Sequence, residues 1–367
     1  MNISCGIVGL PNVGKSTLFN ALLKKQQAFA ANFPFATIEP NIGIVPVPDD
    51  RLVKLAQSVK DADKLEKLPP IVPATVEFVD IAGLIAGAHK GEGLGNKFLA
   101  HIRETDAILH VVRAFENPDI IREGSRDPIS DLDVIETELI MADYQTIEKQ
   151  KEPRGSGDKE AERKWQVVKK IKEDLNKGIP ARLVQLNEQE HLIARELSLL
   201  TMKPILVALN ISEENLINHK EIVSSFSRDA NVSKDCVTAI CAKLEEDMAT
   251  LTDEERMEYL GVHQIQFDGL ANVINRAFQT LGLITFLTAG EKEVRAWTIT
   301  KGTLAPQAAG VIHTDFEDKF IKAQVIEYND YIDLGGEKKA KESGKLRLEG
   351  KDYVVKDGDV IEFKVGA

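Results

Sequence analysis

The chain is poor in cysteine and has no long, uninterrupted apolar run. Its three cysteines, Cys5, Cys236 and Cys241, are odd in number and show neither a CxxC pair nor a zinc-type spacing. The longest apolar stretch, residues 71–88, is interrupted by two carboxylates, so we expect no membrane-spanning segment and no membrane partner. No signal-peptide pattern precedes the first apolar segment. Together with the cysteine usage, this predicts a cytoplasmic protein.

An excess of positive charge is also missing. The 367 residues carry a formal net charge of −12, which excludes a polycation that coats nucleic acid, and we expect no DNA partner. Any contact with RNA has to come from a local basic face. The length is typical of two or three domains and is sufficient for a large core.

One short stretch near the amino terminus carries a phosphate-binding motif. Residues 9–17, GLPNVGKST, lie between an apolar run at Ile3–Val8, which predicts a buried strand, and a helical pattern at Thr17–Lys25. The glycines let backbone N–H groups turn toward one anion, and the helix amino terminus adds partial positive charge. The residues predicted to bind nucleotide here are Asn12, Val13, Gly14, Lys15, Ser16 and Thr17. Lys15 is also a candidate catalytic residue, because its ammonium group can reach the β- and γ-phosphates.

Two later segments complete a predicted magnesium and γ-phosphate site. Thr37 lies in an irregular segment with two prolines and two phenylalanines, where P-loop GTPases place a threonine on Mg²⁺. Asp80 ends a strand predicted at Ala74–Ile81, and a glycine follows three residues later. We therefore predict that Ser16, Thr37 and Asp80 hold Mg²⁺, and that the Gly83 N–H meets the γ-phosphate as part of catalysis.

The position after Gly83 departs from Ras-like enzymes, which place a water-orienting glutamine there. Leu84 occupies this position, and leucine neither donates nor accepts a hydrogen bond. The glycine-rich run that follows contains His89, whose imidazole titrates near neutral pH, and we predict that it orients the attacking water. A protein that uses nucleotide only as a structural ligand is the alternative that Leu84 leaves open.

The base-recognition motif is altered as well. A strand predicted at Pro204–Leu209 ends in Asn-Ile-Ser-Glu, where GTPases use Asn-Lys-x-Asp. The longer glutamate weakens the bidentate fit to guanine, whereas an asparagine can pair with the N6/N7 edge of adenine. A second predicted strand, Val237–Ile240, leads into the other base loop. The residues predicted to contact the base are Asn210, Ile211, Glu213, Cys241 and Ala242. These changes favour ATP over GTP, and a GTP-preferring switch of the same fold stays open.

Residues 131–200 show no strand pattern, and apolar residues recur at steps of three and four, with a break at residues 152–158. We predict an antiparallel helical hairpin, of coiled-coil type, inserted into the nucleotide domain. Residues 145–178 contain ten Lys/Arg (149, 151, 154, 159, 163, 164, 169, 170, 172, 177) and seven Asp/Glu (148, 152, 158, 160, 162, 173, 174), a local balance of +3. This surface is either a solvated helical face or a contact for RNA phosphates.

The predicted fold class is α/β, a P-loop NTPase with a mostly parallel, doubly wound sheet. Residues 1–130 and 201–281 form the predicted nucleotide-binding domain. From residue 282 to 367, short β-type runs alternate with glycine-bearing turns, which predicts a separate α+β domain. Within it, a helix is expected at residues 308–312 or 337–343. No heptad seam is long enough to demand a dimer, and we expect a monomer.

The chain resembles the YchF/Obg-like ATPase family over essentially its full length. The resemblance rests on GLPNVGKST, NFPFATIEPN (residues 32–41), DIAGLIAGAHKGEGLGN (residues 80–96) and the altered base motif. It implies slow hydrolysis of ATP in preference to, or alongside, GTP, ribosome or ribosomal RNA binding, a role in regulating translation or a stress response, and a carboxy-terminal TGS-like β-grasp domain. In that family the histidine matching His89 is thought to be catalytic. Asn12 matches the asparagine that coordinates K⁺ in related GTPases, so K⁺ is a possible second cofactor beside Mg²⁺.

Overall fold

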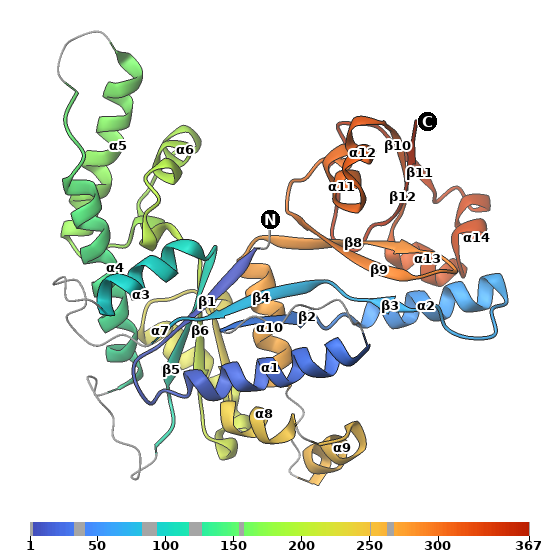
Figure 1. The fold of residues 1–367 in the computed structure, drawn as a ribbon, viewed down its shortest axis with the longest axis horizontal. Helices are drawn as coiled ribbons and strands as arrows, with labels where there is room; N and C mark the ends of the chain where they lie inside the picture. The colour runs from blue at the N-terminus through green and yellow to red at the C-terminus, as the bar shows by residue number, and fades with distance from the viewer. Residues whose placement is uncertain are drawn as a thin grey trace. The chain divides into compact units, whose positions relative to one another are not determined.

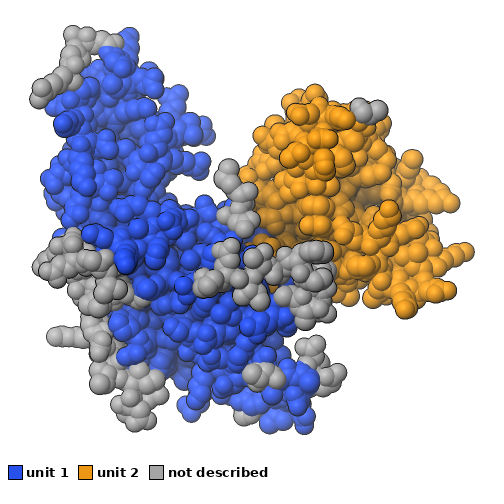
Figure 2. Space-filling model, viewed as in Figure 1, with its two compact units in different colours: residues 1–45, 77–281 blue, residues 46–76, 282–367 orange. Residues whose placement is uncertain are grey.

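The computed structural model describes residues 3–32, 41–82, 94–116, 127–153, 158–249, 251–262 and 268–366. The chain forms two compact units, one made of residues 1–45 and 77–281, the other of residues 46–76 and 282–367 (Figure 2). Each unit is organised around its own β-sheet. Within the described ranges, no helix has the length and apolar character needed to cross a membrane.

The sheet of the first unit has six strands in the order β2-β4-β1-β5-β6-β7. Their bounds are β1 Ser4–Val8, β2 Ile42–Pro46, β4 Thr75–Asp80, β5 Ala107–Arg113, β6 Ile205–Asn210 and β7 Val237–Ile240. The pairs β1–β4, β1–β5, β5–β6 and β6–β7 are all parallel. Every residue of β5 and of β6 is buried, as expected of central strands covered on both faces. The predicted α/β fold with a mostly parallel sheet is confirmed.

Helices of the first unit surround this sheet (Figure 1). They are α1 Lys15–Asn32, α3 Leu94–Glu104, α7 His219–Asp229, α8 Ala242–Met248, α9 Asp253–Val262 and α10 Gly269–Thr280, with short 3₁₀ turns η4 Glu213–Asn218 and η5 Lys234–Cys236. Asp268 caps α10, because its side chain accepts a hydrogen bond from the Ala271 N–H. Helix α8 begins at Ala242, directly after Cys241, which follows β7.

The helical insertion contains more than the predicted hairpin. Its elements are α4 Pro128–Glu148, α5 Lys159–Asn176, η2 Ala181–Leu183, α6 Glu188–Glu196 and η3 Leu200–Met202. Asp127 and Asp158 cap α4 and α5, each accepting from two backbone N–H groups. Apolar side chains from these elements form a separate cluster that includes Ile140, Ile147, Val168, Ile171, Leu175 and Ala194. The insertion therefore has a small core of its own, to which the third helix, α6, contributes.

The second unit has a mixed sheet in the order β11-β10-β12-β8-β9-β3. Its elements are α2 Asp50–Asp63, β3 Ile71–Val72, β8 Leu283–Ala289, β9 Val294–Thr300, α11 Ala305–Ile312, α12 Thr314–Asp318, β10 Phe320–Ile326, α13 Tyr328–Leu334, α14 Glu337–Glu342, β11 Arg347–Glu349 and β12 Val360–Val365. Strands β8 and β9 form an antiparallel hairpin, and β12 lies between β8 and β10, parallel to β8. This is the predicted β-grasp arrangement. Both candidate helices are present, and β10 ends at Ile326, before α13.

Residues 46–76 are the main departure from the predicted domain boundaries, which placed them in the nucleotide-binding domain. The structure groups them with residues 282–367. Strand β3 pairs in parallel with β9, through Ile71 and Val294. Arg51 of α2 donates hydrogen bonds to Asp357 at 2.8 Å and to Thr285 at 2.9 Å. The apolar face of α2 and its guanidinium contacts thus place this segment in the second unit.

Candidate nucleotide site

The phosphate loop between β1 and α1 has the backbone conformation that its sequence predicts. Asn12 has φ 62° and Gly14 has φ 92°, two values in the left-handed region that asparagine and glycine adopt most readily. Helix α1 begins immediately afterwards at Lys15, so its unbonded N–H groups border the loop. The loop can therefore receive an anion at a helix amino terminus.

Lys15 and Asp80 form an ion pair between Nζ and Oδ1. Asp80 is the last residue of β4, and it stands opposite Ile7 of the neighbouring strand β1. Ser16 is exposed in the first turn of α1. A hydroxyl and a carboxylate are hard oxygen ligands of the kind that Mg²⁺ prefers, so the described part of the predicted metal site fits this ion. The other predicted residues of this site, Thr37, Gly83 and His89, lie outside the described residues, as does Leu84.

A pocket of about 990 Å³ lies beside the phosphate loop, where β6 and β7 end. Seven of the predicted nucleotide-binding residues line it: Asn12, Gly14, Thr17, Asn210, Ile211, Glu213 and Cys241. The structure thus brings together the phosphate loop and both loops that were predicted to contact the base. Val13 and Ala242 lie behind this surface and are 2% and 0% exposed.

Asn210 binds other parts of the protein, which argues against its predicted pairing with an adenine edge. Its Nδ2 donates to the Val13 carbonyl at 2.9 Å, and its Oδ1 accepts from the Ala242 N–H at 3.0 Å. A Cβ added at Gly14 would stand 2.1 Å from Asn210 Nδ2. The Asn210 side chain therefore joins the phosphate loop to the base loop after β7.

Two aromatic residues of the pocket were missed by the sequence analysis, Phe115 and Tyr259. Arg113, the last residue of β5, lies over the Phe115 ring at 4.7 Å from its centroid. Tyr259 of α9 donates a hydrogen bond to Glu213 Oε1 at 2.7 Å. No pattern marks either residue, because both reach the pocket through tertiary packing of segments that are distant in the sequence.

Glu245 of α8 connects the second base loop to the helices that follow it. It is 4% exposed, and its Oε1 accepts from the Leu270 N–H at 3.0 Å, in the first turn of α10. Arg256 of α9 lies 3.8 Å from Glu245 Oε2 and donates to Asp268 at 3.1 Å. Burial, followed by the nearby Asp268 charge, raises the pKa of Glu245 to about 7. This carboxyl group therefore titrates near neutral pH.

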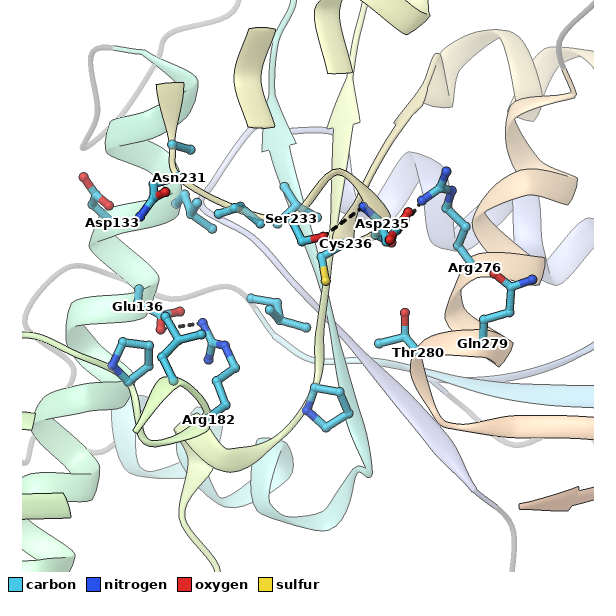
Figure 3. Close-up of a pocket in the computed structure, with 18 residues that line it drawn as sticks. Asp133, Glu136, Arg182, Asn231, Ser233, Asp235, Cys236, Arg276, Gln279 and Thr280 are labelled. Atoms are coloured by element: carbon cyan, nitrogen blue, oxygen red, sulfur yellow. Dashed lines mark hydrogen bonds and ion pairs between the residues drawn. The ribbon is translucent and has the colours of Figure 1, made fainter. Parts of the chain in front are cut away.

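A second pocket, of about 590 Å³, lies at the other end of the strands, near the amino-terminal ends of β6 and β7 (Figure 3). On one side, Arg182 of η2 pairs with Glu136 of α4 at 2.6 Å. On the other, Arg276 of α10 donates to the Asp235 carbonyl at 3.0 Å, beside the half-buried Cys236. None of the predicted site residues that the structure describes lines this pocket.

Comparison with known proteins decides the family. Residues 283–366 match the family model described as "YchF-GTPase_C: Protein of unknown function (DUF933)", and residues 4–143 match "MMR_HSR1: 50S ribosome-binding GTPase". A protein of Haemophilus influenzae named "Ribosome-binding ATPase YchF" is 50% identical over 370 residues, which covers 99% of each chain. The chain belongs to the YchF family. The corresponding Bacillus subtilis protein is 47% identical, again over 99% of each chain.

A solved structure shows the same fold in this family. The Schizosaccharomyces pombe YchF GTPase is 38% identical to this chain and superposes with a TM-score of 0.85. The match covers 99% of this chain and 98% of the S. pombe chain. The resemblance predicted from the sequence motifs is thereby confirmed. With its P-loop domain, this YchF-family chain has the predicted enzyme class, nucleoside triphosphate hydrolase.

Proposed function

We propose that the chain is a Mg²⁺-dependent ATPase that binds ATP in preference to GTP, associates with ribosomes in the cytoplasm, and regulates translation or a stress response. The proposal rests on one observation: an intact phosphate loop and an altered base loop line the same pocket. In that pocket, the segment from Asn210 to Glu213 stands where a guanine-specific motif is expected. The names of the curated relatives, ribosome-binding ATPases, support the same reading.

In the proposed reaction, the phosphate loop binds the triphosphate and excludes water from its backbone N–H groups. Lys15 leaves Asp80 and contacts the β- and γ-phosphates, while the Gly83 N–H contacts the γ-phosphate. Ser16, Thr37 and Asp80 would hold Mg²⁺, and the bound ion would supply positive charge beside the phosphate oxygens. His89 orients the attacking water, since Leu84 has no group that could do so. Catalysis then consists of positioning and electrostatic stabilisation.

The base loop supports the preference for adenine. The Ile211 side chain is 1% exposed and packs in the apolar cluster below the pocket, so it does not replace the flexible stem of the lysine found in Asn-Lys-x-Asp motifs. Glu213 is one methylene longer than the aspartate that accepts from guanine. Both changes weaken guanine binding without removing the space for a purine.

The helical insertion is the proposed site of contact with ribosomal RNA. Five of its basic side chains are exposed and make no ion pair within the described ranges: Lys149, Lys151, Lys159, Arg163 and Lys169. By contrast, Lys164, Lys170 and Lys172 pair with carboxylates of the insertion itself. The exposed group can release counterions on binding phosphates, so ribosome affinity should fall as salt increases. We expect the protein to act as a monomer.

The test of nucleotide choice is a titration of the protein with ATP and with GTP, in Mg²⁺ and K⁺ buffer. The proposal requires tighter binding of ATP. Tight GTP binding with weak ATP binding would show the alternative, a GTP-preferring switch. Repeating the hydrolysis assay with Na⁺ in place of K⁺ tests whether Asn12 binds K⁺, and equal rates would exclude that role.

His89→Ala tests the catalytic assignment. We expect loss of hydrolysis with retained ATP binding, because the residue is assigned to the water and not to the nucleotide. An unchanged rate would remove His89 from the mechanism. If the unmodified protein binds ATP but does not hydrolyse it, alone or with ribosomes, the second alternative holds: nucleotide is then a structural ligand of a ribosome-binding module.

A further inference from the structure

Tyr259 and Glu213 share one hydrogen bond at the edge of the base pocket. The phenol donates to Glu213 Oε1 at 2.7 Å, and both side chains line the pocket of about 990 Å³. The hydrogen bond to Glu213 also raises the pKa of Tyr259, so the hydroxyl keeps its proton at neutral pH and remains a donor. A carboxylate that a guanine would use is therefore already engaged by a group of the protein.

Helix α9 holds the phenol in this position. Arg256, one turn before Tyr259, donates to Asp268 at 3.1 Å and lies 3.8 Å from Glu245. Tyr259 and Leu260 also pack against the apolar cluster that contains Ile211 and Cys241. These contacts hold α9 in place on both its polar and its apolar side. The Tyr259 hydroxyl is therefore already positioned next to Glu213, and forming the hydrogen bond costs little side-chain entropy.

Guanine and adenine differ in the hydrogen-bond donors that they present to the Glu213 carboxylate. Guanine has two donors on this edge, N1–H and the N2 amino group. A carboxylate accepts a hydrogen bond from each of them only when both of its oxygens are available. Adenine has no N1–H and no N2 amino group, so it gains nothing from a bidentate carboxylate. An oxygen that already accepts a short hydrogen bond from a phenol is a weaker acceptor for a second donor.

We propose that Tyr259 is a specificity-determining residue, which engages the Glu213 carboxylate and thereby lowers the affinity of the pocket for guanine nucleotides. It acts through Glu213 and is a positioning residue, not a catalytic one. The inference rests on the proposed preference for ATP and adds a cause of it that lies outside the base motif, on a separate helix.

The experiment measures the dissociation constants of ADP, GDP and IDP for the full chain and for Tyr259→Phe, so that no hydrolysis is needed. The variant keeps the ring and removes only the donor. We expect GDP affinity to rise about tenfold, since a charged acceptor becomes available, while ADP affinity changes by less than about twofold. IDP carries N1–H but no N2 amino group, and its gain should lie between the two.

A double-mutant cycle separates this role from a general loosening of α9. In a Glu213→Gln background the carboxylate is gone, so Tyr259→Phe should no longer raise GDP affinity. Tyr144→Phe, a phenol of the helical insertion that lies outside the pocket, serves as the matched control. Equal changes for ADP and GDP, or the same change in both backgrounds, would overturn the proposal.

The proposed function and this inference fail in different ways. If the unmodified chain binds GDP more tightly than ADP, the proposed preference for ATP is wrong. If it prefers ADP and Tyr259→Phe leaves the GDP/ADP ratio unchanged, the preference stands and only the role of Tyr259 is rejected.

Discussion

Gly14 and Asn210 are packed so closely that a Cβ at position 14 would lie 2.1 Å from the Asn210 amide nitrogen. The same amide donates to the carbonyl of Val13, and its oxygen accepts from the Ala242 N–H. One side chain at the end of β6 therefore fixes the loops on either side of the nucleotide pocket. This arrangement requires glycine at position 14 for two separate reasons, the contact and the φ of 92°.

Gly14→Ala should therefore abolish tight nucleotide binding and lower the free energy of unfolding by about 2 kcal/mol or more, since the new methyl group must displace Asn210. Isothermal titration with ADP and chemical unfolding would measure both. Gly43→Ala is the matched control, because a Cβ there meets its nearest neighbour, Leu23, at 3.5 Å, an ordinary contact. Unimpaired ADP binding by Gly14→Ala would contradict the packing.

Asp80 competes with phosphate for Lys15, because the two side chains form an ion pair. Asp80→Asn should raise the affinity for Mg²⁺-free ATP about threefold to tenfold, since the ammonium group loses a charged partner. The same variant should lose most of the increase in affinity that Mg²⁺ produces. Titrations of ATP in EDTA and in Mg²⁺ would show both effects. Glu77→Gln, on the same strand, should change neither, and weaker binding of Asp80→Asn in EDTA would argue against the competition.

Glu245 should make the first unit less stable as the pH rises through neutrality. Burial raises the pKa of this carboxyl group from 4.5 to about 7. Between these two values the folded protein holds the proton more tightly than the unfolded chain, so the free energy of unfolding falls as the pH increases. Glu245→Gln keeps an oxygen for the Leu270 N–H and removes the titration. We expect it to reduce the loss of stability between pH 5 and pH 8 by about 2 kcal/mol.

Chemical unfolding at the two pH values measures this loss. A Trp297→Phe background leaves Trp165 as the fluorescent reporter of the first unit, since the chain has two tryptophans. Glu258→Gln, an exposed position on α9, is the control. An identical pH dependence in the Glu245→Gln and control proteins would show that Glu245 does not titrate in this range.

The three cysteines should differ sharply in reactivity. Cys5 is fully buried and its pKa is raised to about 12, mainly by burial, and burial also raises the pKa of Cys241. Cys236 is only half-buried and borders the second pocket. Since the thiolate is the reactive form, iodoacetamide should modify Cys236 at least about tenfold faster than the other two, as peptide mass spectrometry can measure. Faster labelling of Cys5 would contradict the burial of β1.

The phosphate loop and the central strands could be predicted because their signals are local. The fixed spacing of glycines in the phosphate-loop motif indicates the backbone conformation of the loop. The apolar runs of β5 and β6 indicate strands that are buried on both faces. Contacts between segments that are distant in the sequence produce no comparable local pattern. The role of Asn210 depends on Val13 and Ala242, which lie in other segments, and Tyr259 reaches Glu213 from α9. Thr37, Gly83 and His89 stay predictions, because the structure does not describe them.

Strand β3 shows the same limitation at the level of the fold. It has two residues, too few for a recognisable period, and it is defined by its partner β9. The amphipathic helix α2 lies within residues 1–130, which were predicted to form part of the nucleotide-binding domain. Its pattern shows that one face is buried without showing against which sheet. Position along the chain therefore assigned this segment to the nucleotide-binding domain, whereas the structure groups it with the second unit.

The pairing of β3 with β9 also constrains how the chain can fold while it is being made. Ile71 leaves the synthesising ribosome long before its partner Val294 exists. At about 5–20 residues per second, on the order of 200 intervening residues take roughly 10–40 seconds. During this time residues 46–76 lack the later segment with which they form the second unit, while β4 can already pair with β1, and β2 with β4. The first unit can thus form during translation, whereas the sheet of the second unit is complete only after β12, Val360–Val365, has been made.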